Sequence, residues 1–129
     1  MELQRIAENN YYSLFINVEK NRAFLKIKGF WGKRESVSNY LSDWKKVTSL
    51  LRRNFTLQTD ASEMNTHPQD VRNLHEEAQV IIVKAGVRKI AEIIKDDIAE
   101  IQLNAMAKRT QLPKRNFKSS KDADVWLDE

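Results

Sequence analysis

Residues capable of acid–base or ligand-binding chemistry gather in one short segment, Asp60-Ala61-Ser62-Glu63-Met64-Asn65-Thr66-His67. Asp60, Ser62 and His67 are the residue types of a hydrolytic triad, but no nucleophile-elbow pattern of the form G-x-S-x-G accompanies them. Cysteine is absent from the sequence, which excludes thiol nucleophiles, thiolate metal ligands and disulfides. We therefore expect a non-enzymatic protein in which this segment binds rather than catalyses.

Neither a metal ion nor a nucleotide cofactor is expected. His67 and His75 are eight residues apart, whereas two ligands on one helix face need a spacing of about four. No third ligand has a recognisable spacing, so we expect both to be ordinary solvent-exposed histidines. The phosphate-binding patterns G-x-x-x-x-G-K-[ST] and G-x-G-x-x-G do not occur.

The elements that must position this segment follow from the period of the apolar residues. Strands are predicted near residues 11–18, 23–30, 55–60, 87–94 and 115–118, and helices near residues 36–52, 68–85, 96–110 and 120–128. The order β-β-α-β-α-β-α-β-α favours parallel βαβ units with an antiparallel hairpin at one edge. The predicted fold class is α/β, with a mixed five-stranded sheet and about four packed helices in one domain over residues 1–129.

The helix starts carry capping signals. Ser36 is a predicted N-cap, and Thr66 with Gln69 has capping-box spacing around Pro68. The candidate segment would then be a polar loop between a parallel strand and a helix N-terminus, where open α/β sheets bind ligands and where anions are favoured. The alternative is that Ser62 and Thr66 only cap the backbone.

Large apolar residues are assigned mostly to the core. Trp44 lies on the apolar stripe of its helix, and Trp126 is expected to pin the last helix to the sheet. The helix near residues 96–110 is expected to carry Ile98, Ile101 and Ala105 on its apolar face, with Leu103 and Met106 as further candidates. Trp31 follows a strand and is expected in the core or at its edge, with an exposed position as the alternative.

Composition indicates an ordinary globular protein of 129 residues, with 41% hydrophobic and 31% charged residues and a net charge of +4. The longest strongly apolar run, Val80-Ile81-Ile82-Val83, is too short to span a membrane, and residues 1–10 lack a signal-peptide core. We expect a cytoplasmic protein. The stretch from Lys108 to Lys121 has six basic residues and no acid; it either meets a polyanion or is a solvated connection. Because the net charge is mild, no nucleic acid is expected as a partner.

The order and spacing of four segments resemble the SpoIIAA-like fold of STAS domains and the wider STAS/SEC14 group, and small bacterial proteins of this type most of all. The segments are Gly29-Phe30, Phe55-Thr56-Leu57-Gln58-Thr59-Asp60, Ala85-Gly86-Val87-Arg88-Lys89-Ile90-Ala91, and the terminal Phe117…Asp122-Ala123…Trp126-Leu127. The likeness covers roughly residues 11–128.

The resemblance implies a regulatory domain that binds a protein partner. In anti-sigma-factor antagonists, a serine in a pattern similar to D-x-S-x-M-D-S-S-G is phosphorylated. Asp60, Ser62 and Met64 match that pattern, but the phosphorylated serine falls on His67 and its neighbour on Thr66. We therefore expect these five residues to form the partner or ligand loop, without a phosphorylation switch.

The SEC14 side of the resemblance implies an alternative function. Phe30 and Trp31 would then line a groove for a lipid-like ligand, or the same region would hold a small anion. Core packing of the aromatic side chains is the competing interpretation, and it is the favoured one. The sequence leaves the partner, the ligand and the oligomeric state open.

Overall fold

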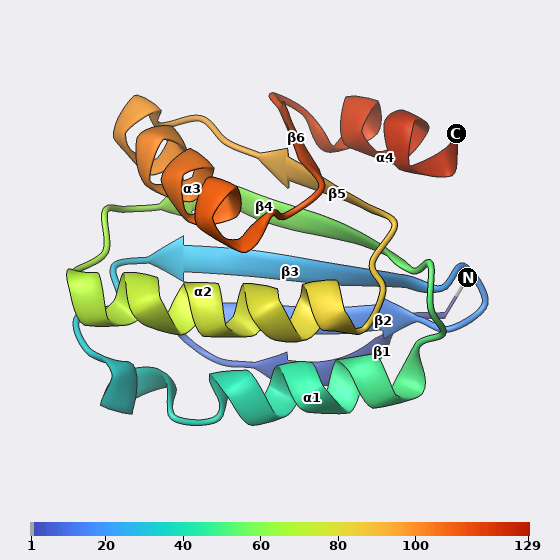
Figure 1. The fold of residues 1–129 in the computed structure, drawn as a ribbon, viewed down its shortest axis with the longest axis horizontal. Helices are drawn as coiled ribbons and strands as arrows, with labels where there is room; N and C mark the ends of the chain where they lie inside the picture. The colour runs from blue at the N-terminus through green and yellow to red at the C-terminus, as the bar shows by residue number, and fades with distance from the viewer. Residues whose placement is uncertain (1) are drawn as a thin grey trace.

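A computed structural model describes residues 2–129. Six strands form one mixed sheet in chain order: β1 (Gln4–Glu8), β2 (Tyr12–Asn17), β3 (Arg22–Gly29), β4 (Thr56–Met64), β5 (Lys89–Ile93) and β6 (Lys114–Phe117). The helices are α1 (Tyr40–Leu50), α2 (Gln69–Lys84), α3 (Asp97–Thr110), α4 (Ser120–Asp128) and the short 3-10 helix η1 (Arg34–Val37). Strands β1 to β3 pair antiparallel, and β3 to β6 pair parallel (Figure 1).

The predicted hairpin is confirmed. Tyr12, Leu14 and Ile16 of β2 are buried on one face of the sheet, as strict alternation requires. The tight link between β2 and β3 is made possible by Asn21, which has a positive φ of 56°.

The prediction of five strands is wrong, because β1 precedes them. Gln4, Arg5 and Glu8 make this strand largely polar, so it shows no clear alternation. What forms it is the antiparallel ladder with β2, in which Gln4 pairs with Ile16 and Arg5 with Phe15. That pairing is a tertiary contact, which local propensity does not report.

Two predicted helix starts are also wrong. The predicted helix near residues 36–52 is split, because η1 comes first and α1 begins after Asn39; Ser36 lies inside η1. Thr66 does not cap α2, because Pro68 occupies the N-cap position and no side chain caps it. Helices α3 and α4 do have side-chain caps, because Asp96 accepts the N–H of Ala99 and Ser119 accepts the N–H of Asp122.

Strand β4 is longer than predicted and absorbs much of the expected loop. It continues past a register shift, so that Lys28 pairs with Glu63 and Gly29 with Met64. An ion pair of 2.7 Å between Lys26 and Glu63 spans the shift. Pairing with β3 therefore keeps the chain extended through Met64.

The helices form two layers. Helices α1, α2 and α3 cover one face of the sheet and enclose the main core, which contains Trp31 and Trp44 (Figure 1). Helix α4 lies on the other face against β4, β5 and β6, over a small cluster formed by Ala91, Ile93, Ala123 and Leu127. No helix between residues 2 and 129 is long and apolar enough to cross a membrane.

Candidate functional site

The carboxyl ends of β3, β4 and β5 lie at one end of the molecule, at the left of Figure 1. From there the chain enters η1, α2 and α3 respectively. This is the edge at which open α/β sheets hold ligands. A functional site is therefore expected among the residues that follow these three strands.

Two histidines form a buried hydrogen-bonded pair at this end. His67 Nδ1 lies 3.0 Å from His75 Nε2, and the His67 Nε2 atom lies 3.1 Å from the carbonyl oxygen of Gly29. A carbonyl only accepts, so Nε2 of His67 carries the proton, and Nδ1 of His67 accepts from Nε2–H of His75. The side chains are only 2% and 3% exposed, respectively, so the expectation of solvent-exposed histidines is wrong.

Trp31 covers the pair. Its ring centroid lies 5.2 Å from that of His67 and 4.7 Å from that of His75. Its indole nitrogen donates to the carbonyl of Tyr11 at 2.9 Å and contacts that of Lys28 at 3.2 Å. Trp31 is fully buried, which confirms core packing for this residue over an exposed position.

The backbone of His67 ties α2 to α3. Its N–H donates to Oε1 of Gln102 at 3.0 Å. Its carbonyl accepts from Nη1 of Arg72 at 2.7 Å and from Nε2 of Gln102 at 3.3 Å. His67 thus joins β3, α2 and α3 through one residue.

Both histidines are held neutral. Burial, and then the neighbouring His67 ring, lower the pKa of His75 to about 3. Burial also lowers the pKa of His67. The hydrogen bond to the Gly29 carbonyl raises this pKa, and the positive charge of Arg72 lowers it further. The two rings are stacked and hydrogen-bonded to one another. The two histidines therefore link β3 to α2 and do not face a substrate.

The residues of the predicted loop do not lie together. Asp60 and Ser62 are on β4, where Oδ1 of Asp60 accepts from the Ser62 N–H at 3.0 Å and from its hydroxyl at 2.6 Å. They line an open hollow of about 280 Å³ together with Ile93, Lys95, Lys118, Ser119 and Ser120. Met64 and His67 are buried, and Thr66 is exposed.

Phe30 and Trp31 do not share a groove. Phe30 is 56% exposed, with its ring 6.4 Å from that of His67, whereas Trp31 is buried beneath it. Ile98 and Ile101 of α3 come four residues and one residue before the His67 partner Gln102, and they are 57% and 68% exposed. The three exposed apolar residues Phe30, Ile98 and Ile101 are called the end patch below.

The prediction that Ile98 and Ile101 lie on the buried face of this helix is wrong, whereas Leu103 and Met106 are buried as predicted. Helix α3 instead buries Ala99, Leu103 and Met106, which have helical spacing of their own. Small Ala99 allows α3 to lie close to its neighbours, and the two isoleucines then point outward. A helix with two apolar stripes does not reveal which one is covered.

A narrow cavity of about 30 Å³ lies between the sheet and helices α2 and α3. It is lined mostly by aliphatic side chains, with His75, Gln79 and Glu92 among the polar ones. Such a volume holds a water molecule or so, far less than a lipid-like ligand.

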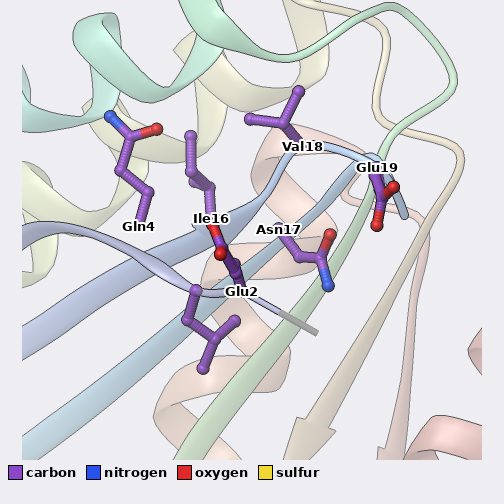
Figure 2. A pocket seen from close by; sticks show the side chains of 7 residues that line it. Glu2, Gln4, Ile16, Asn17, Val18 and Glu19 are labelled. Atoms are coloured by element: carbon purple, nitrogen blue, oxygen red, sulfur yellow. The ribbon is translucent and has the colours of Figure 1, made fainter.

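Another hollow lies at the opposite end of the sheet. It has a volume of about 500 Å³ and is open, between the start of β1 and the end of β2 (Figure 2). Glu2 and Glu19 contribute carboxylates, and Ile16 and Val18 contribute apolar surface. None of the predicted site residues lines it.

Sequence reasoning also missed a buried ion pair. Nζ of Lys114 lies 2.7 Å from Oε1 of Glu92, with both side chains almost fully buried. Asn104 and Asn116 accept the other protons of this ammonium group at 2.6 and 2.7 Å. Burial raises the pKa of Glu92, although Lys114 opposes the shift.

The basic stretch from Lys108 to Lys121 is therefore partly used inside the protein. Besides Lys114, Arg109 pairs with Glu76 at 2.6 Å, and Nζ of Lys118 donates to the carbonyl of Ile94 at 3.1 Å. The expectation of a solvated connection is therefore wrong for Lys114, whose side chain is buried.

Among residues 2–129 no group of three or more His, Cys, Asp or Glu side chains is arranged to hold a metal ion. No protein-family model and no curated protein sequence matches the chain.

Solved structures do match it. An uncharacterized protein of the DUF3478 family with a SpoIIAA-like fold, from Shewanella loihica PV-4, superimposes with a TM-score of 0.64 at 12% identity, covering 94% of this chain and 97% of that chain. SiaC of Pseudomonas aeruginosa superimposes with a TM-score of 0.51 at 12% identity, covering 91% and 100%. The fold is SpoIIAA-like, as the spacing of the four segments indicated.

Proposed function

We propose that this chain is a non-enzymatic, regulatory domain that binds a protein partner through the end patch. The observation that carries the proposal is the exposure of Phe30, Ile98 and Ile101, by 56%, 57% and 68%, at the carboxyl end of the sheet. Exposed apolar side chains grouped on a soluble protein are a common mark of an interaction surface. Hydrogen bonds of the buried His67 to Gly29 of β3 and to Gln102 of α3 tie together the two segments that carry the patch.

The polar groups at this end support binding over catalysis. The imidazole nitrogens that join His67 to Gly29 and His75 are engaged in hydrogen bonds, and Trp31 covers both rings. A general base must reach the proton that it removes. Neither histidine is open to a substrate in this arrangement.

The small-molecule alternative has less support. The narrow cavity of about 30 Å³ is too small for a lipid-like ligand. The hollow beside Ser62 has two lysines, but the Asp60 carboxylate also lines it and would repel an anion.

Affinity capture from extracts of the source cells tests the proposal. Ile101→Asp should abolish recovery of the partner, because a carboxylate replaces an apolar contact at the centre of an interface. Val125→Asp is the matched control, since Val125 is 58% exposed on the outer face of α4. Equal recovery with both variants, or loss with both, would contradict binding through the end patch.

A further inference from the structure

Four polar side chains converge on the narrow cavity between the sheet and helices α2 and α3. Thr59 of β4 and Glu92 of β5 are directly paired in the parallel register, so they lie side by side on the sheet face that these helices cover. His75 and Gln79 are one turn apart on α2 and therefore share a face of that helix. One pair lines the cavity from the sheet and the other from the helix, and all four residues are more than nine-tenths buried.

Three of these side chains each use one polar atom in a hydrogen bond to the surrounding protein. Listed with their partners, these atoms are Nε2 of His75 with His67, Oε1 of Gln79 with Thr110, and Oε1 of Glu92 with Lys114, at 3.0, 2.7 and 2.7 Å. The second polar atom of each, which is Nδ1, Nε2 and Oε2 respectively, makes no hydrogen bond within residues 2–129, and neither does the Thr59 hydroxyl. Because buried polar atoms in native proteins almost always have a partner, these four atoms call for one in the cavity.

The size of the cavity limits what that partner can be. A cavity needs a volume of about 10–15 Å³ to hold a water molecule. This one has about 30 Å³, which admits one water molecule and at most a second, and no organic ligand. A cation is disfavoured, because the Lys114 ammonium group lies 2.7 Å from Glu92 and no three His, Cys, Asp or Glu side chains come together to hold a metal among residues 2–129.

The hydrogen-bonding roles of the four atoms are complementary to a single water molecule. His75 is neutral with its proton on Nε2, so its Nδ1 atom accepts, and the Glu92 carboxylate also accepts. The amide nitrogen of Gln79 donates, and so does the Thr59 hydroxyl. Since water donates twice and accepts twice, one molecule can satisfy all four atoms. Buried waters typically make about three such bonds.

We propose that this cavity binds one ordered water molecule through these four atoms. The water joins two buried clusters that no direct hydrogen bond connects within residues 2–129, which are the His67–His75 pair and the Glu92–Lys114 pair. A continuous hydrogen-bonded path then runs from the Gly29 carbonyl of β3, through both clusters, to β6 at the edge of the sheet. The polar side chains in this part of the core are thus members of one network.

Crystallography of the full chain, with and without xenon pressure, tests the proposal. The electron density should show a water molecule within hydrogen-bonding distance of at least three of the four atoms. Xenon should not enter, because it occupies dry apolar cavities and not hydrated ones. A cavity that is empty in the density, or one that takes up xenon, would overturn the proposal.

Deuteron relaxation dispersion of the solvent, which counts the water molecules held inside a protein, provides a second measurement. Ala78→Val should remove one such water, because Ala78 lines the cavity from the same face of α2 as His75 and Gln79. Ala105→Val is the matched control and should leave the count unchanged, since Ala105 is exposed on α3. Circular dichroism verifies that each variant is folded. An unchanged count in folded Ala78→Val would contradict the proposal, and neither measurement depends on partner binding through the end patch.

Discussion

His67 and His75 show how two polar side chains become part of a core. Each gives up solvation, and the chain compensates by linking them to one another and to the Gly29 carbonyl. The sequence contained one signal for this: His75 lies in the same helical stripe as Val71, Ala78 and Ile82, all of which are buried. The sequence contained no signal for the burial of His67, because the position of His67 against Gly29 depends on the parallel pairing of β3 with β4.

The neutral state of His75 predicts a dependence of stability on pH. Its pKa is lowered to about 3 in the folded protein and is ordinarily about 6.5 in an unfolded chain. Below pH 6.5 the unfolded state therefore binds more protons, and the free energy of unfolding falls as the pH is lowered. Each such histidine contributes a slope of about 1.4 kcal/mol per pH unit within that window.

Urea unfolding between pH 7.5 and pH 5 measures this slope. Most carboxylates have a pKa of about 4 and therefore titrate below this range. His75→Leu should be less stable at pH 7.5, because it leaves Nδ1 of His67 without a donor, and it should show a shallower slope. An unchanged slope in that variant would mean that His75 is not the titrating group.

A second prediction at this scale concerns phosphorylation. The position of the phosphorylated serine in the SpoIIAA-like pattern is His67 here, which is buried. Thr66 is exposed and does not cap α2. The prediction that this loop has no phosphorylation switch therefore depends on the histidine at the serine position and not on a capped Thr66. Mass spectrometry of the protein purified from its source cells should find Thr66 and Ser62 unmodified. Substantial phosphate on either residue would restore a phosphorylation switch.

Among the helices and strands, those that depend on the local pattern of apolar residues were predicted from the sequence. The hairpin, β5, α3, β6 and α4 lie within a few residues of their predicted places. The errors at β1, at the end of β4 and at the start of α1 have one cause, which is pairing or packing with a distant segment. The polar segment β1 forms a strand because it pairs with β2. Strand β4 continues to Met64 because it stays paired with β3.

Helix α4 provides a prediction of its own. Trp126 is half-buried against Phe117 at a ring distance of 5.5 Å, and Nζ of Lys89 lies 4.7 Å from the Trp126 ring. Trp126→Ala should cost about 2–3 kcal/mol, below the range of about 3–5 for a fully buried aromatic, because part of the ring is in water. Thermal or urea unfolding measures the loss. Unchanged stability would show that α4 is not held by this contact.

At the scale of the whole molecule, the sheet divides the protein into surfaces with different properties. The end patch takes in Phe30, which follows β3, and two residues of α3, far apart in sequence. That β3 and β5 end at the same edge of the sheet could not be predicted without the order of the strands. The candidate segment from Asp60 to His67 was correctly located near the carboxyl edge of the sheet, but β4 distributes its side chains between the core, a shallow hollow and the surface.

The central claim, that the end patch binds a protein partner, is tested most directly by hydrogen–deuterium exchange on the chain with and without its captured partner. Binding should slow backbone exchange around residues 29–31 and in the first two turns of α3, and should leave α4 unchanged. Protection confined to α4 or to the hollow between β1 and β2, with no change at Phe30, Ile98 and Ile101, would contradict the claim.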